Sequence, residues 1–178
     1  TRNVLMKSGF ECPEKYGDPA LLLSLFYKPE IKHENFISII PNEGTNKNEI
    51  INELIDKNKC LYINMKKYEK WTDIIDIIAN SSFVISESLH GLIVAETYKI
   101  PSVWVEFKDH SYHTDWNFKF LDFYTSINKF GMHSIKLYEG YNFDELIKLR
   151  NKWQPSEINY KELVKLFPFK ITRKYELN

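Results

Sequence analysis

Short apolar segments alternate with amphipathic segments between residues 36 and 106, and this alternation constrains the fold more than any other feature. The apolar segments are rich in β-branched residues and cover residues 36–40, 60–64, 83–85 and 103–105. Between them, apolar side chains recur at helical spacing in residues 44–55, 71–78 and 89–98. This repeated order of strand and helix predicts a parallel sheet that helices cover on both faces.

The segments on either side do not continue the alternation. Residues 107–118 are polar and aromatic without a clear period, which is typical of a functional loop. Helical patterns return after this loop, in residues 119–128, 142–153 and 158–167. We therefore expect one domain over residues 1–178, with a lead-in segment (1–35), a core (36–106) and a loop followed by C-terminal helices (107–178).

The balance of charges argues against one class of function. Lysine plus arginine and aspartate plus glutamate each number 24, so the formal net charge is zero. A protein that binds nucleic acid through a general basic surface needs a surplus of lysine and arginine, because its affinity comes from counterion release. We expect no nucleic-acid partner.

The sequence shows neither a membrane-spanning segment nor a leader segment. No apolar run approaches the ~20 residues that cross a bilayer, and no basic stretch precedes an apolar one as in a signal peptide. Cys12 and Cys60 lie far apart and lack metal-binding spacing, and such sparse cysteine usage fits a reducing compartment. We expect a cytoplasmic protein, either free or peripheral at the inner face of the membrane.

The richest candidate site is the turn that joins the third predicted strand to the next helix. Ligands of open parallel sheets bind at the carboxyl ends of the strands. Four turns of this chain qualify: residues 41–44, the stretch after Asn64, residues 86–91 and the loop after Glu106. At the third turn, free N–H groups and the helix dipole favour a phosphate or a carboxylate. Its residues are Ser86, Glu87, Ser88, Leu89, His90 and Gly91.

Each side chain of this turn has a functional and a structural interpretation. His90 could donate to an anion or move a proton, and Gly91 would allow close approach of a ligand. Equally, Ser88 could only cap the helix, His90 could pack against the sheet and Gly91 could only ease the helix–strand contact. Glu87 could be an acid or base beside His90 or a solvated side chain, and Glu106 competes with it for the same role.

Residues 86–95, followed by Ile100 and Pro101, resemble the S-x-x-L-H-G-x-x-x-A…G-x-P signature of the polysaccharide pyruvyl transferase family. Other stretches are similar to the same family, and residues 118–126 resemble a segment of its exopolysaccharide branch. In chain order these stretches are residues 16–23, 39–41, 118–126 and 163–169. The matches extend over nearly the whole chain in the right order, so the resemblance identifies the chain as a member of this family.

The resemblance implies a fold and a reaction. Members of the family are similar to GT-B glycosyltransferases, which have two Rossmann-like domains with the active site between them. This chain would be the C-terminal domain, an α/β, Rossmann-like parallel sheet flanked by helices, and an N-terminal domain would precede it. Members transfer the enolpyruvyl unit of phosphoenolpyruvate to two hydroxyls of a sugar, which forms a pyruvate ketal and releases phosphate. The implied partners are phosphoenolpyruvate and a glycan or lipid-linked sugar. The residues of the sequence require no metal, and we expect no cofactor.

The resemblance also implies roles for the residues of the turn. His90 matches the active-site histidine of the family, which would bind phosphoenolpyruvate or deliver a proton. Many members carry an arginine, a bidentate partner of carboxylate and phosphate, where this chain has Ser88. A different cation must therefore serve here, with Lys108 and Lys119 as candidates by position. The predicted substrate-binding residues are Ser86, Glu87, Ser88, Leu89, Gly91, Glu106, Lys108 and Lys119.

Two other functions stay open. A GT-B glycosyltransferase with a nucleotide-sugar donor would hold a diphosphate at the same helix N-terminus. A non-catalytic half-domain would bind an anionic metabolite or a partner domain.

Some polar residues have simpler interpretations. Asp18 is expected to close an Asx turn before Pro19, and Glu96 is expected to be structural. The histidines at 110 and 113 fit no settled metal spacing, which favours a polar acceptor-binding loop. Tyr112 and Trp116 could stack on sugar faces or anchor this loop to the core.

Overall fold

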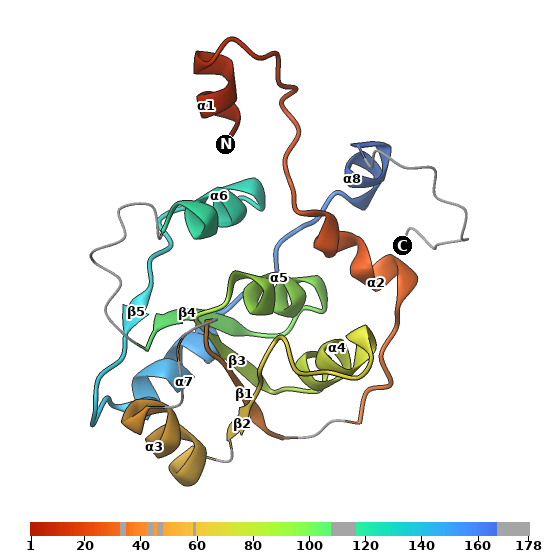
Figure 1. Ribbon diagram of the computed structural model, residues 1–178. Helices are drawn as coiled ribbons and strands as arrows, with labels where there is room; N and C mark the ends of the chain where they lie inside the picture. Colours follow the sequence, from red (N-terminus) through yellow and green to blue (C-terminus); the bar gives the residue numbers. More distant parts are fainter. Residues whose placement is uncertain (33–34, 43–44, 46–47, 59, 108–116, 167–178) are drawn as a thin grey trace.

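The described residues of this computed structural model form a five-stranded parallel sheet with helices on both faces (Figure 1). The structure describes residues 1–32, 35–42, 45, 48–58, 60–107 and 117–166. Within the sheet the strands follow the order β2-β1-β3-β4-β5. Their bounds are β1 (Ile37–Ile40), β2 (Cys60–Tyr62), β3 (Phe83–Ser86), β4 (Ser102–Glu106) and β5 (Ile135–Lys136). The predicted α/β, Rossmann-like fold is confirmed.

Helices precede, separate and follow the strands. The bounds are α1 (Arg2–Lys7), the 3₁₀ helix η1 (Pro19–Leu22), α2 (Leu23–Phe26), α3 (Glu49–Asn58), α4 (Trp71–Ala79), α5 (Leu89–Thr97), α6 (Phe118–Ser126), α7 (Phe143–Lys152) and α8 (Tyr160–Leu166). No helix in the described ranges is both long and apolar enough to cross a membrane.

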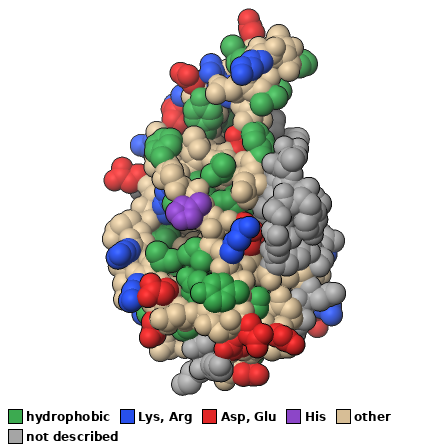
Figure 2. Space-filling model, turned by 90° about the vertical axis from the view of Figure 1, so that its left-hand side faces the viewer, with side chains coloured by type: hydrophobic (Ala, Val, Ile, Leu, Met, Phe, Trp, Pro, Cys, Tyr) green, Lys and Arg blue, Asp and Glu red, His purple; other side chains and the backbone are tan. Residues whose placement is uncertain are grey.

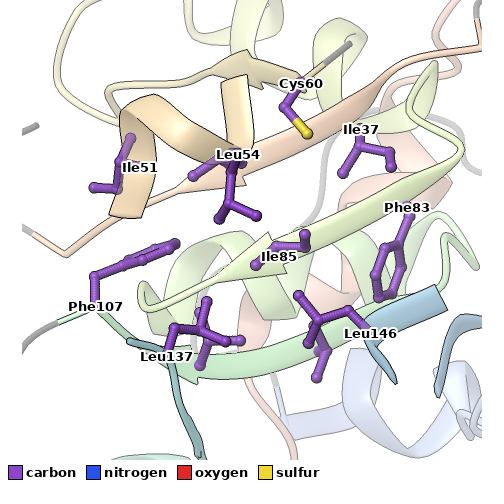
Figure 3. Packing of buried hydrophobic residues seen from close by; sticks show 12 residues of the cluster. Ile37, Ile51, Leu54, Cys60, Phe83, Ile85, Phe107, Leu137 and Leu146 are labelled. Carbon is purple, nitrogen blue, oxygen red and sulfur yellow. The ribbon is translucent and has the colours of Figure 1, made fainter. Parts of the chain in front are cut away.

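The strands are apolar on both faces because each face packs against helices. Side chains at alternate positions of the central strands point to opposite sides. On one side they meet α3 and α7, and Figure 3 shows this cluster with Ile37, Phe83, Ile85, Ile51, Leu54 and Leu146. On the other side, Ile40 and Val84 pack against α4 and α5. Trp104 stacks on Phe120 of α6, with ring centroids 4.3 Å apart.

The chain reverses its direction across the sheet at β1 and β3. From β1 it passes through α3 to β2, and from β2 it returns through α4, on the opposite face, to β3 beyond β1. After β3 it continues away from β1 to β4 and β5. The carboxyl ends of β1 and β3 therefore form the switch point, where doubly wound sheets bind their ligands.

Some element boundaries differ from those that the sequence predicts. The helix expected from residue 44 begins at Glu49, where the Asn48 side chain accepts the Ile51 N–H (3.0 Å) and caps it. Strand β2 ends at Tyr62, because Asn64 forms a turn in which its side chain accepts the Lys66 N–H (2.9 Å). Strand β5 was not expected, since two residues are too few to show a period. Helices α6 to α8 match the predicted helices to within two residues.

The two halves of the lead-in segment differ in burial. None of the residues of α1 is buried (Figure 1), although Thr1, its N-cap, contacts Asp122 of α6 at 2.6 Å. Leu21 of η1, by contrast, is buried against α5 and α6. The Asp18 side chain accepts the Ala20 N–H at 2.8 Å, so the predicted Asx turn is confirmed.

Candidate functional site

A cavity of about 870 Å³ lies at the carboxyl ends of β1, β2 and β3. We call it the strand-end cavity. Its walls come from the residues at and after the ends of the three strands and from parts of α4, α5, η1, α2 and α6. The polar and aromatic residues among them are Asn42, Thr45, Tyr62, Asn64, Lys66, Lys67, Tyr68, Trp71, Ser88, His90 and Lys119. Figure 2 shows one side of the molecule on which hydrophobic, histidine and lysine or arginine side chains lie close together.

Ser86 fixes the shape of the turn between β3 and α5. Its side chain is fully buried, and its Oγ accepts the Ser88 N–H at 3.0 Å. The same hydroxyl lies 2.8 Å from the Ser88 carbonyl oxygen, to which it donates, and 3.3 Å from the Ile40 carbonyl oxygen. Ser86 therefore uses its hydroxyl on backbone groups of the turn and of β1.

Glu87 is fully buried, and its carboxylate faces the protein rather than solvent. One oxygen accepts the Phe107 N–H (3.0 Å) and the other accepts the Asn42 N–H (3.1 Å). Asn42 follows β1 and Phe107 follows β4. Glu87 thus links the carboxyl ends of three neighbouring strands and holds the turn that carries His90.

Ser88 is the N-cap of α5, as predicted, but its side chain makes no capping hydrogen bond. The first hydrogen bond of the helix runs from the Leu92 N–H to the Ser88 carbonyl (3.2 Å). The N–H groups of Leu89, His90 and Gly91 precede this ladder at the positive end of the helix dipole. Because Ser88 and His90 line the strand-end cavity, this arrangement suits an anion.

His90 is exposed, so it does not pack against the sheet. It lies in the first turn of α5 and lines the strand-end cavity together with Ser88. Its ring can therefore meet a ligand that enters from solvent. Leu89 lies beside a separate, smaller cavity of about 410 Å³ that α6 also lines.

Gly91 allows α5 to lie directly on the sheet. A Cβ atom at this position would come within 2.7 Å of the Ser86 Oγ and 2.9 Å of the Ile40 Cδ1. Both distances are shorter than a normal contact, so a side chain would push the helix away from β1 and β3. The close contact is between elements of the protein itself.

The other predicted residues lie in different places. Glu106 is buried at the end of β4, where its carboxylate accepts a hydrogen bond from the Ser134 hydroxyl, and it is not among the cavity residues. Lys119, on α6, is exposed and lines the strand-end cavity. Lys108 lies outside the described residues, as do the predicted loop residues His110, Tyr112, His113 and Trp116.

The described lining of the strand-end cavity is positively charged. It includes three lysines, Lys66, Lys67 and Lys119, and none of the described residues that line it is a carboxylate. The chain as a whole has a formal net charge of zero. Among the described residues, the cavity lining is therefore richer in positive charge than the chain as a whole, which favours an anionic ligand.

Comparison with known proteins identifies the family of the chain. The sequence model of one family, described as polysaccharide pyruvyl transferase, matches residues 1–110. The chain belongs to the polysaccharide pyruvyl transferase family. The match includes β1 to β4 and the turn that carries His90. No curated protein and no solved structure matched this chain.

The structure places two lysines beside His90 that the sequence analysis did not select. Lys66 and Lys67 follow β2 in one of the four turns at the strand ends, but their sequence gave no sign that they share a cavity with His90. The signal that could have found them was the strand order, because only β1 lies between β2 and β3.

Among the described residues, no group of three or more His, Cys, Asp or Glu side chains comes together in a way that could hold a metal ion.

Glu96 lies in the second half of α5. It pairs with Lys129 (2.7 Å) and accepts the Ser156 N–H (2.6 Å), so its predicted structural role is confirmed.

Proposed function

We propose that this chain uses phosphoenolpyruvate as its donor and forms a pyruvate ketal on a sugar of a surface polysaccharide or its lipid-linked precursor. One observation carries the proposal. The strand-end cavity brings His90 and the amino terminus of α5 together with three lysines, and its described lining contains no carboxylate. Phosphoenolpyruvate carries a phosphate and a carboxylate, and both favour such surroundings.

The reaction needs an acid and a binding site for a leaving phosphate. A proton adds to the methylene carbon of phosphoenolpyruvate, and a sugar hydroxyl forms a bond to the adjacent carbon. The carbon–oxygen bond to phosphate then breaks, and a second hydroxyl closes the ketal. One hydroxyl proton replaces the proton that the acid gave, and the other leaves with phosphate. We assign the acid to His90, whose ring is exposed to the cavity.

The anion-binding groups divide between the backbone and the lysines. The N–H groups at the start of α5 and the Ser88 hydroxyl would hold one anionic group of the donor. Lys119, from α6, would supply the positive charge that many relatives obtain from an arginine at the position of Ser88. Ser86 and Glu87 would position these groups through their contacts with the backbone.

The resemblance to GT-B enzymes supports a further part of the proposal. The strand-end cavity would be the donor side of an active site that a second Rossmann-like domain completes. In that arrangement the chain described here binds phosphoenolpyruvate, and transfer requires the complete enzyme.

Binding of the donor can be tested on the chain itself. In a thermal-shift titration, we expect phosphoenolpyruvate to raise the Tm of the wild-type chain, because a ligand that binds only the native state stabilises it. We expect His90→Ala to reduce this shift and the matched variant His133→Ala, which changes an exposed histidine elsewhere, to preserve it. A shift with UDP-sugars but none with phosphoenolpyruvate would reject the proposal in favour of a nucleotide-sugar glycosyltransferase.

The role of His90 in the chemistry needs the complete enzyme. We expect His90→Ala to abolish acceptor-dependent release of phosphate from phosphoenolpyruvate while the circular dichroism spectrum and Tm stay close to wild type, since the side chain is exposed. Retained phosphate release would show that the acid lies elsewhere.

A further inference from the structure

The β2–α4 loop (63–70, yellow in Figure 1) and the first residue of α4 expose two large aromatic side chains. Tyr68 is 51% exposed and Trp71 is 53% exposed. Tryptophan is highly buried on average, as Trp104 is in this chain. Both exposed side chains line the strand-end cavity, so they form part of its rim. More than half of each side chain is open to solvent there.

Hydrogen bonds at both ends hold the β2–α4 loop in one shape. The Asn64 side chain accepts the N–H of residue 66 (2.9 Å), and the Asn64 backbone oxygen accepts the Lys67 N–H (3.0 Å). At the other end, the Asp73 carboxylate accepts the Glu69 N–H (3.2 Å) and the Lys70 N–H (2.8 Å). These backbone groups therefore have partners within the protein, which lowers the cost of moving the loop into a poorly hydrated layer.

The ring of Trp71 is held in place from one side. Tyr27 meets it edge-on, with 5.3 Å between the ring centroids. The Tyr27 hydroxyl in turn donates to the Asp76 carboxylate at 2.6 Å. Because its neighbour is fixed in this way, the exposed ring of Trp71 loses little conformational freedom when it contacts a partner.

Lysines alternate with the two aromatic residues in this segment. Lys67 precedes Tyr68, Lys70 precedes Trp71, and both lysines are exposed. Glu69 is the one acidic residue between them. Tyrosine and tryptophan rings settle at the headgroup level of a bilayer, and lysines close to a bilayer attract anionic lipids. The segment thus offers both kinds of side chain that a membrane surface binds, within five consecutive residues.

We propose that residues 67–71 dock the protein on the surface of a bilayer that contains anionic lipids. Tyr68 and Trp71 enter the headgroup layer, and Lys67 and Lys70 lie against the lipid phosphates. The contact is reversible, because two lysines and two aromatic rings are a small anchor. This inference goes beyond the proposed function, since it concerns where the chain works rather than what it transfers. Docking by this rim turns the strand-end cavity toward the membrane.

The test measures co-sedimentation of the 178-residue chain with vesicles. One set of vesicles contains phosphatidylcholine and phosphatidylglycerol, and the other contains phosphatidylcholine alone. We expect binding to the anionic vesicles to be ~5-fold or more tighter than to the neutral ones, and to weaken as salt is added. Tryptophan fluorescence should shift to the blue on binding, and Trp71→Phe should remove this shift. Equal binding to the two sets, or no binding to the anionic vesicles, would overturn the inference.

A pair of lysine variants tests the electrostatic part of the contact. We expect Lys67→Ala/Lys70→Ala to weaken binding to the anionic vesicles by ~10-fold or more. The matched variant Lys152→Ala/Lys161→Ala removes the same charge from exposed positions outside this segment and should bind as the wild type does. An equal loss in both variants would show that only the net charge of the chain matters, and the docking segment would be rejected.

A pair of aromatic variants tests the apolar part. We expect Tyr68→Ala/Trp71→Ala to weaken vesicle binding by ~5-fold or more, while Phe130→Ala/Tyr138→Ala, at positions 71% and 63% exposed, should leave it unchanged. Tyr68→Ala alone keeps the contact between Tyr27 and Trp71, so it gives the same readout where the double variant has a low Tm. Wild-type vesicle affinity in Tyr68→Ala and in the double variant would contradict the assigned role of the two rings.

A soluble headgroup distinguishes a membrane from a free phosphate compound. Glycerol phosphate carries the same anionic group without a bilayer, and we expect it not to displace the chain from anionic vesicles. Displacement by glycerol phosphate would indicate a site for a small phosphate ligand and overturn the inference. The outcome is independent of the donor proposal, because vesicle binding is measured without phosphoenolpyruvate. A chain that binds vesicles but shows no thermal shift with phosphoenolpyruvate would support docking and reject the donor.

Discussion

At the scale of single residues, Glu87 shows how little a side chain's type says about its role. The sequence places it beside His90 in a loop, where a glutamate could be an acid, a base or a solvated charge. Its two backbone partners, Asn42 and Phe107, are 45 and 20 residues away. No local pattern can reveal such partners, because they become neighbours only when three strands are placed side by side.

The contacts of Glu87 predict a large loss of stability when its carboxylate is removed. Glu87→Ala leaves two backbone N–H groups without their acceptor, and we expect the free energy of unfolding to fall by about 3 kcal/mol. Glu87→Gln keeps one acceptor oxygen and should cost about 1 kcal/mol. Urea denaturation of both variants and of Glu139→Ala, at an exposed position, measures the differences. A Glu87→Ala variant as stable as wild type would contradict this role.

At the scale of elements, helix α5 depends on how closely it meets the sheet. Gly91 faces Ser86 of β3 and Ile40 of β1, and its lack of a side chain sets their distance. The opposite half of the helix is held by Glu96, which is buried and pairs with Lys129. The position of the helix amino terminus, and so of His90, follows from these contacts at both ends.

Gly91→Ala should therefore change stability and ligand binding together. Alanine favours a helix by about 1 kcal/mol over glycine, but its Cβ would overlap Ser86 and Ile40 and force a shift that costs about 1–3 kcal/mol. We expect a net loss of stability and weaker binding of phosphoenolpyruvate in calorimetry. Asn151→Ala, at an exposed position of α7, is the matched control. Unchanged affinity for phosphoenolpyruvate would show that the position of α5 does not matter for the donor.

At the scale of the whole molecule, the lead-in segment and the last described helix meet although they are far apart in sequence. Lys15 contacts Glu162 of α8 at 2.6 Å, and Lys165 contacts the same carboxylate at 2.8 Å. The hydrogen bond from Lys15, then that from Lys165, lowers the pKa of Glu162 from 4.5 to about 2. The Glu162 carboxylate is solvent-accessible, so water and salt weaken the effect.

This pKa predicts the direction of a pH effect. Because the folded-state pKa is below the unfolded value, Glu162 contributes stability above about pH 4.5 and loses it as the pH falls toward about 2. We expect Glu162→Gln to have a lower Tm than wild type at neutral pH and low salt, with the difference closing between about pH 4.5 and 2. A difference that is independent of pH would show that the carboxylate charge is not responsible.

Much of the fold could be predicted, because local patterns carry it. The four core strands, the three helices between them and the three C-terminal helices all appear as apolar periodicities. Strand β5 could not be predicted, since its two residues pair with the end of β4 and show no pattern of their own. The His90 turn was found from its motif, whereas Thr45, Lys66 and Lys67 have no motif and share a cavity with it only through the strand order.

The sequence by itself determined the α/β class, the family and the turn with His90, because each depends on residues that are close together along the chain. Only the tertiary structure decided which side chains surround that turn. In the folded chain the Glu87 carboxylate accepts backbone N–H groups, and Gly91 lies against Ile40. The two lysines that follow β2 line the same cavity as His90. The physical reason is that a parallel sheet brings the ends of its strands to one edge, and their order across the sheet differs from their order in the sequence.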